Sequence, residues 1–192
     1  SNGLLEPPTL TNLDKRPIVK NKDGNVSTED SITIRTDKGQ TIIPQIVGGK
    51  RLTQEQAIAH FQQTGEHLGV YADTASAERA ATDLHLRQQD RTNPNFKSIR
   101  STMAAIGITD PTEQSAWLGN MAVETGGTFD PHIKQRGGGT GHGLFQFSKG
   151  GLKESYFEWL GNTPDTIETQ LKFTHAAIYG GGDANGINPS ER

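Results

Sequence analysis

One stretch, residues 117–147, constrains most strongly what this chain can fold into, because it joins an acid-bearing helix to a long glycine-rich segment. Asp110 is a good helix N-cap, and Pro111 suits a first helical position. Gly126 and the glycine after it are natural helix ends. The sequence therefore predicts a helix over residues 111–125.

Glu124 lies in the last turn of this predicted helix, on the same face as Trp117 and Met121. An apolar face is normally buried, and both burial and the helix dipole favour the protonated form of an acid placed there. A carboxyl group that keeps its proton near neutral pH can act as a general acid. Glu124 is therefore the candidate catalytic residue.

The segment after the acid has the features of a cleft. Residues 126–143 are long enough for a short hairpin or loop that forms one wall. Phe145 or Phe147 can offer a flat apolar surface to a sugar ring, and Gln146 can pair with an acetamido group through its amide. These residue types suit an N-acetylated sugar polymer.

The remaining chain predicts an α+β protein with two parts. Residues 1–14 are polar and proline-bearing and are expected to form an arm or linker; residues 15–92 are expected to form a small α+β module. The module should contain a meander of strands over 16–21, 31–36 and 40–47, followed by helices over 53–65 and 73–91. Residues 95–192 should form a mainly helical domain.

In that domain, helices are expected over 96–107 and 152–160, and another from Pro164, at its first position, to Gly180. Leu152 and Ile178 are assigned to the apolar faces of the last two. The sequence of residues 183–192 predicts a loop that leads toward the start of a further helix. We therefore expect a domain that is truncated at its C-terminus.

Composition excludes several functional classes. The formal net charge is −3, and the 19 lysines and arginines are dispersed, so no nucleic-acid contact is predicted. The chain has no cysteine, and no apolar run reaches the length of a membrane span. His132 and His142 lack the close spacing of zinc ligands and are interpreted as surface or cleft-rim residues. No metal and no cofactor are expected.

Two phrases resemble a known family. WLGNMAVETGGTFDP (117–131) and GHGLFQF (141–147) are similar to the phage tail lysozymes and, more broadly, to the lysozyme-like superfamily that includes soluble lytic transglycosylases. The resemblance implies that Glu124 is the catalytic acid, that Thr125 supports it by hydrogen bonding at the substrate cleft, and that Gln146 lines the cleft. Asp130 is the candidate second carboxylate, although a role as cap of the turn before Pro131 is favoured.

Residues 12–90 resemble a module found in structural proteins of tailed bacteriophages, through RPIVKN, IPQIV, HFQQTGEHLG and ASAERAATDLH. Together the two resemblances imply a virion-associated muramidase that cuts the β-1,4 bond between N-acetylmuramic acid and N-acetylglucosamine. Its expected partners are peptidoglycan glycan strands and other virion proteins, and its expected place of action is the bacterial cell wall or periplasm. A lytic transglycosylase and a non-catalytic virion protein with a decayed lysozyme domain are the alternatives.

Overall fold

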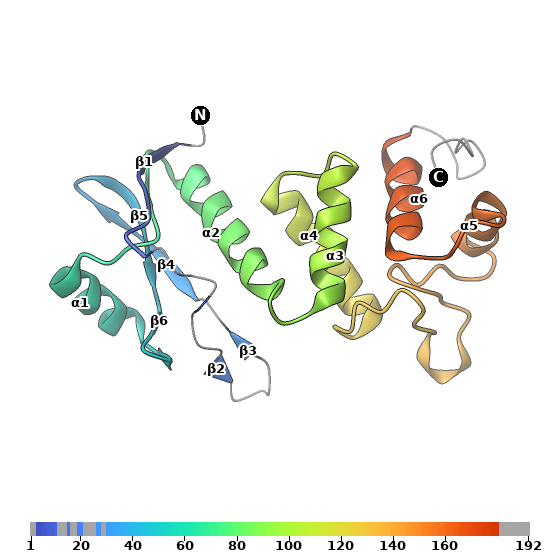
Figure 1. Ribbon diagram of the computed structural model, residues 1–192, viewed down its shortest axis with the longest axis horizontal. Helices are drawn as coiled ribbons and strands as arrows, with labels where there is room; N and C mark the ends of the chain where they lie inside the picture. The colour runs from blue at the N-terminus through green and yellow to red at the C-terminus, as the bar shows by residue number, and fades with distance from the viewer. Residues whose placement is uncertain (1–2, 11–14, 16–18, 21–25, 28–29, 181–192) are drawn as a thin grey trace. The chain divides into compact units, whose positions relative to one another are not determined.

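The computed structural model describes residues 3–10, 15, 19–20, 26–27 and 30–180. The chain divides between Asn93 and Pro94 into two compact units. The first unit contains antiparallel sheets and two helices, and the second is mainly helical (Figure 1). The predicted α+β class is confirmed.

The first unit is built on a four-stranded antiparallel sheet. Its strand order is β1 (Leu4–Glu6), β8 (Val70–Tyr71), β5 (Gly39–Pro44) and β4 (Ser31–Thr36). Ile32 pairs with Ile43 in the β4–β5 hairpin, and that hairpin was predicted from its alternating apolar residues. Pro44 is the last residue of β5, where the missing amide hydrogen is tolerated.

Two features of this sheet differ from the sequence predictions. Residues 4–6, expected in an arm, form an edge strand because their backbone pairs with β8. The strand β2 (Val19–Lys20) pairs with β3 (Val26–Ser27) in a separate two-stranded sheet and not with β4. Residues 22–25, where a turn is expected from the sequence Lys-Asp-Gly-Asn, lie outside the described residues. A third small sheet joins β6 (Ile46–Val47) to β7 (Lys50–Arg51).

The two helices of this unit, α1 (Gln54–Thr64) and α2 (Thr74–Gln89), both pack on β5 (Figure 1). Thr53 and Gln56 form a capping box at the start of α1, and Asp73 caps α2. The core between α2 and the sheet contains Ile42 and Leu84.

The second unit contains α3 (Pro94–Ala105), α4 (Pro111–Thr125), the 3₁₀ turn η2 (Arg136–Gly138), α5 (Leu152–Leu160) and α6 (Ile167–Tyr179). Helix α6 contacts both α3 and α5 (Figure 1). A hydrophobic cluster, aromatic except for one leucine, forms the core beside α5 and α6. Its buried members are Phe147, Tyr156, Trp159, Leu160 and Phe173.

The start of α6 differs from its prediction. Thr166 is the N-cap and forms a capping box with Thr169, so the helix begins at Ile167 and not at Pro164. Leu152 and Ile178, assigned to apolar faces, are exposed. The predicted loop at residues 183–192 lies outside the described residues. Among the described residues, none of the helices has the length and apolar character that crossing a membrane requires.

Candidate active site

The end of α4 positions the candidate acid. Asp110 accepts hydrogen bonds from the backbone N–H groups of Thr112 and Glu113, which fixes the start of the helix, and Pro111 is its first residue. Gly126 ends it at φ 61°, in the left-handed conformation that glycine adopts without steric cost. The predicted bounds of this helix are confirmed, and they place Glu124 in the last turn.

The predicted burial of Glu124 is wrong. The buried residues of α4 are Gln114, Trp117, Leu118, Met121 and Thr125. At 100° per residue, Glu124 lies at the edge of the arc that these residues cover. Its side chain is exposed.

Glu124 instead faces an open cavity of about 300 Å³, which lies at the lower end of the range for small-molecule pockets. One wall of the cavity is the end of α4, and the opposite wall is the segment of residues 133–136, with Gln146 beside it. Glu124 supplies the only carboxylate among the described residues that line this cavity. No hydrogen bond or ion pair occupies that carboxylate within the described part of the chain.

The opposite wall is part of a hairpin, residues 133–143, which we call the cleft-wall hairpin. Lys134 and His142 form an antiparallel bridge. The backbone N–H of Gln135 donates to Gly141 O at 3.0 Å, and that of Gly143 donates to Ile133 O at 2.9 Å. Of the two forms expected for the glycine-rich segment, a hairpin or a loop, the structure has a hairpin at residues 133–143.

Thr125 does not present its hydroxyl group to the cavity. It is 1% exposed; its Oγ1 donates to Met121 O at 2.7 Å and accepts from the backbone N–H of Phe129 at 3.1 Å. The hydroxyl group therefore connects the end of α4 to the segment that follows. These two bonds go to Met121 and Phe129 and not to Glu124, the partner that the family resemblance implies.

Gln146 lines the cavity in a strained backbone conformation. Its φ of 47° is positive, as is the φ of 54° at Phe129, and these are the only non-glycine residues with positive φ in the described chain. Such outliers point to functional sites because the surroundings must impose them. The Gln146 Nε2 donates to Gly143 O at 2.9 Å, and the side-chain oxygen, a hydrogen-bond acceptor, lies beside Gly141.

The aromatic platform expected for a sugar ring is not at this cavity. Phe147 is buried in the aromatic core. Phe145 is half-buried and packs edge-on against Trp117, with ring centroids 5.7 Å apart, and neither phenylalanine is among the lining residues. An apolar surface is offered instead by Val123, which is 80% exposed and lines the cavity next to Glu124.

Asp130 also lies away from the cavity lining. Its Oδ1 accepts from the backbone N–H of His132 at 2.9 Å, which is the turn-capping arrangement favoured by the sequence. Nothing in this geometry brings Asp130 together with Glu124 in one cavity.

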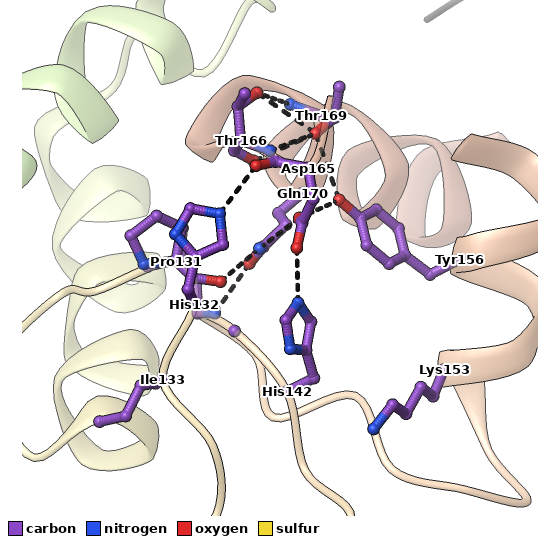
Figure 2. A network of polar contacts seen from close by, with 12 residues as sticks. Pro131, His132, Ile133, His142, Lys153, Tyr156, Asp165, Thr166, Thr169 and Gln170 are labelled. Atoms are coloured by element: carbon purple, nitrogen blue, oxygen red, sulfur yellow. Dashed lines mark hydrogen bonds and ion pairs between the residues drawn. The ribbon is translucent and has the colours of Figure 1, made fainter. Parts of the chain in front are cut away.

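Sequence reasoning missed a polar network centred on Asp165 (Figure 2). The carboxylate accepts from Tyr156 Oη at 2.6 Å and from Gln170 Nε2 at 2.8 Å, and its Oδ2 lies 2.6 Å from His142 Nε2. The imidazole of His132 contacts the Asp165 backbone oxygen at 2.9 Å. Asp165 thereby connects α5, α6 and the cleft-wall hairpin.

Electrostatics reinforce this network. Burial acts to raise the pKa of Asp165, but the hydrogen bonds from Tyr156, Gln170 and His142 outweigh it and hold the pKa below its ordinary value. Burial and the bond to Asp165 both raise the pKa of Tyr156, which stays a phenol donor. His142, expected at a surface or cleft rim, is largely covered with a side chain 13% exposed. Across the described ranges, no group of three or more His, Asp or Glu residues could hold a metal ion.

Comparison with known proteins places the second unit in a family. Residues 94–188 match the family model described as phage tail lysozyme. The second unit belongs to the phage tail lysozyme family. No curated protein and no solved structure matches the chain. Membership in this family supports a virion-associated phage protein that degrades peptidoglycan at the bacterial cell wall.

Proposed function

We propose that the chain is a virion-associated glycosidase that cuts the β-1,4 bond between N-acetylmuramic acid and N-acetylglucosamine, with Glu124 as its general acid. The observation that carries the proposal is the position of Glu124, exposed and without a partner in the described chain, in the cavity between α4 and the cleft-wall hairpin. The family match supports the substrate.

The chemistry follows from the single acid. Glu124 donates its proton to the glycosidic oxygen as the bond from that oxygen to the sugar C1 breaks, which leaves a cation delocalised over C1 and the ring oxygen. The Glu124 carboxylate then removes a proton from water as the water oxygen bonds to C1. The products are a reducing muramic acid end and a free 4-hydroxyl group on the next sugar.

A lytic transglycosylase is the second candidate, and one observation favours it. Hydrolases of this kind usually use a second carboxylate, about 5–10 Å from the first, whereas Glu124 is the only carboxylate among the described lining residues. In this variant Glu124 removes the proton from the sugar's own 6-hydroxyl group. That oxygen bonds to C1, and a 1,6-anhydro ring forms without water.

The first unit, by its resemblance to modules of tailed-phage structural proteins, is proposed to attach the enzyme to other proteins of the particle. No catalytic role is assigned to it. Under this proposal the chain enters the wall with the particle and opens a local hole during phage entry.

The test is Glu124→Gln on purified sacculi. Because general acid catalysis contributes about 10²–10⁴ in rate, clearing should fall by at least about a hundredfold. The melting temperature should stay unchanged, because the exposed carboxylate has no partner in the described chain. Glu158→Gln, which makes the same change at an exposed position on α5, is the matched control and should clear normally.

The released fragments separate the candidates by mass spectrometry, since the two products differ by one water. Reducing muramic ends support hydrolysis, and 1,6-anhydro ends support transglycosylation. A wild-type chain that clears no sacculi would instead support a structural virion protein with a decayed lysozyme domain.

A further inference from the structure

The cavity that holds Glu124 also carries two cations. Lys134 and Arg136 both line it from the cleft-wall hairpin, and both side chains are exposed. Within the described part of the chain, neither forms an ion pair or a side-chain hydrogen bond. Several other cations are paired with carboxylates. These pairs are Lys38 with Glu6, Arg51 with Asp30, Arg87 with Asp83, and Lys172 with Glu168.

The backbone that presents these cations is held on several sides. Lys134 is fixed by its bridge to His142, and His142 is held by Asp165. The side-chain oxygen of Gln135, between the two cations, accepts from the backbone N–H of Gly141 at 3.1 Å. The two charges therefore stand on a wall whose position is set by contacts elsewhere in the unit.

The group that Lys134 and Arg136 are suited to bind is a carboxylate. Arg and Lys side chains bind carboxylates through charge-assisted hydrogen bonds, with arginine able to engage both oxygens. A polymer of N-acetylated sugars alone has no charge to offer them. Peptidoglycan does, through the carboxylates of its peptide stems and, where a stem is absent, through the lactyl carboxylate of the muramic acid.

We propose that Lys134 and Arg136 form a subsite for a carboxylate borne by the muramic acid residue or its peptide stem, next to the scissile bond. This inference rests on the proposed function and narrows its substrate to wall glycan with anionic substituents. Uncharged N-acetylglucosamine polymers bind without this contribution.

The experiment measures binding in a Glu124→Gln background, where no cleavage occurs. The probe is a soluble muropeptide, used with its carboxylates intact and with the same carboxylates converted to methyl amides. Titration calorimetry should give about three- to tenfold tighter binding of the charged form, as two exposed charge contacts imply. The added double substitution Lys134→Gln and Arg136→Gln should abolish that preference.

Lys149→Gln is the matched control, because Lys149 is exposed on the following loop and does not line the cavity. It should keep the preference. The subsite would be overturned by no binding of the charged form, by a preference that survives the double substitution, or by equal binding of both muropeptide forms together with unchanged affinity of the double variant for glycan strands stripped of peptide. Higher salt should weaken binding of the charged form in the parent more than in the double variant.

A third probe identifies the source of the carboxylate. Glycan strands stripped of peptide keep only the lactyl carboxylate. Loss of affinity for these strands in the double variant indicates the lactyl group, and unchanged affinity, with loss confined to peptide-bearing probes, indicates the stem. Because binding is measured without turnover, the two proposals fail independently. An inactive wild-type chain would refute the proposed function, whereas the carboxylate subsite would still be tested by the binding preference.

Discussion

The Nε2 atom of His142 lies 2.6 Å from Oδ2 of Asp165, and this contact connects the cleft-wall hairpin to the segment that precedes α6 (Figure 2). Gln170 extends the connection, since its Nε2 donates to both Asp165 and Pro131 O, and its Oε1 accepts from the backbone N–H of Leu144. The wall that faces Glu124 is therefore positioned by a network centred on one carboxylate outside the cavity.

Asp165→Asn should destabilise the second unit by about 2–3 kcal/mol, because the amide presents a donor where the carboxylate accepts from several donors. Both tryptophans of the chain, Trp117 and Trp159, lie in this unit, so denaturant unfolding followed by tryptophan fluorescence reports on it. Asp130→Asn is the control and should cost little, since an amide oxygen can also cap that turn. Equal effects of the two substitutions would contradict a central role for Asp165.

Acid should remove the contribution of Asp165. Its pKa in the folded chain is below the ordinary value of 3.8, so the unfolded chain binds the proton first as the pH falls. The stabilisation is complete above the unfolded pKa and is lost as the pH drops through the folded one. The difference in unfolding free energy between wild type and Asp165→Asn should therefore shrink below about pH 4. A difference that stays constant from pH 7 to pH 3 would exclude this linkage.

Local sequence signals predicted the helix that carries the acid but not the environment of that acid. Asp110, Pro111 and Gly126 act within a few residues of themselves, so α4 begins and ends as expected. The exposure of Glu124 depends on which arc of α4 the other helices cover. Helical spacing alone could not separate a residue at the centre of that arc from one at its edge.

The sequence predicts a helix that starts at Pro164, which would place Asp165 inside it, so the role of Asp165 was not predicted. Thr166 and Thr169 form the capping box that actually starts α6, which leaves Asp165 just before the helix, with its carboxylate directed at Tyr156 and His142. Thr166 was a signal in the sequence, because threonine is a preferred N-cap residue. The side chains that contact the Asp165 carboxylate, those of His142, Tyr156 and Gln170, come together only through the tertiary fold.

Gly143→Ala should destabilise the second unit by about 3 kcal/mol. Gly143 has φ +73°, and a Cβ atom there would overlap the side-chain oxygen of Gln170, which holds the backbone of Leu144. Gly138→Ala measures the cost of the positive φ alone, because Gly138 has φ +79° and open space around its Cβ position. That control should cost only about 1 kcal/mol in the same fluorescence assay. Similar losses at both positions would mean that the contact with Gln170 is unimportant.

Gln146 allows its backbone and its side chain to be tested separately. Glycine at this position removes the conformational cost of φ 47°, about 1–2 kcal/mol, and also removes the side-chain hydrogen bond to Gly143 O, worth about 1 kcal/mol. Because these two effects nearly cancel, Gln146→Gly should leave the free energy of unfolding nearly unchanged. Gln146→Val keeps the strain, adds a β-branched side chain and should cost about 2 kcal/mol or more. If the amide contacts the acetamido group of the substrate, both variants should raise KM on wall glycan about tenfold despite their different stabilities. Wild-type KM in Gln146→Gly would restrict Gln146 to shaping the turn, whereas activity that follows stability across the pair would assign its effect to folding.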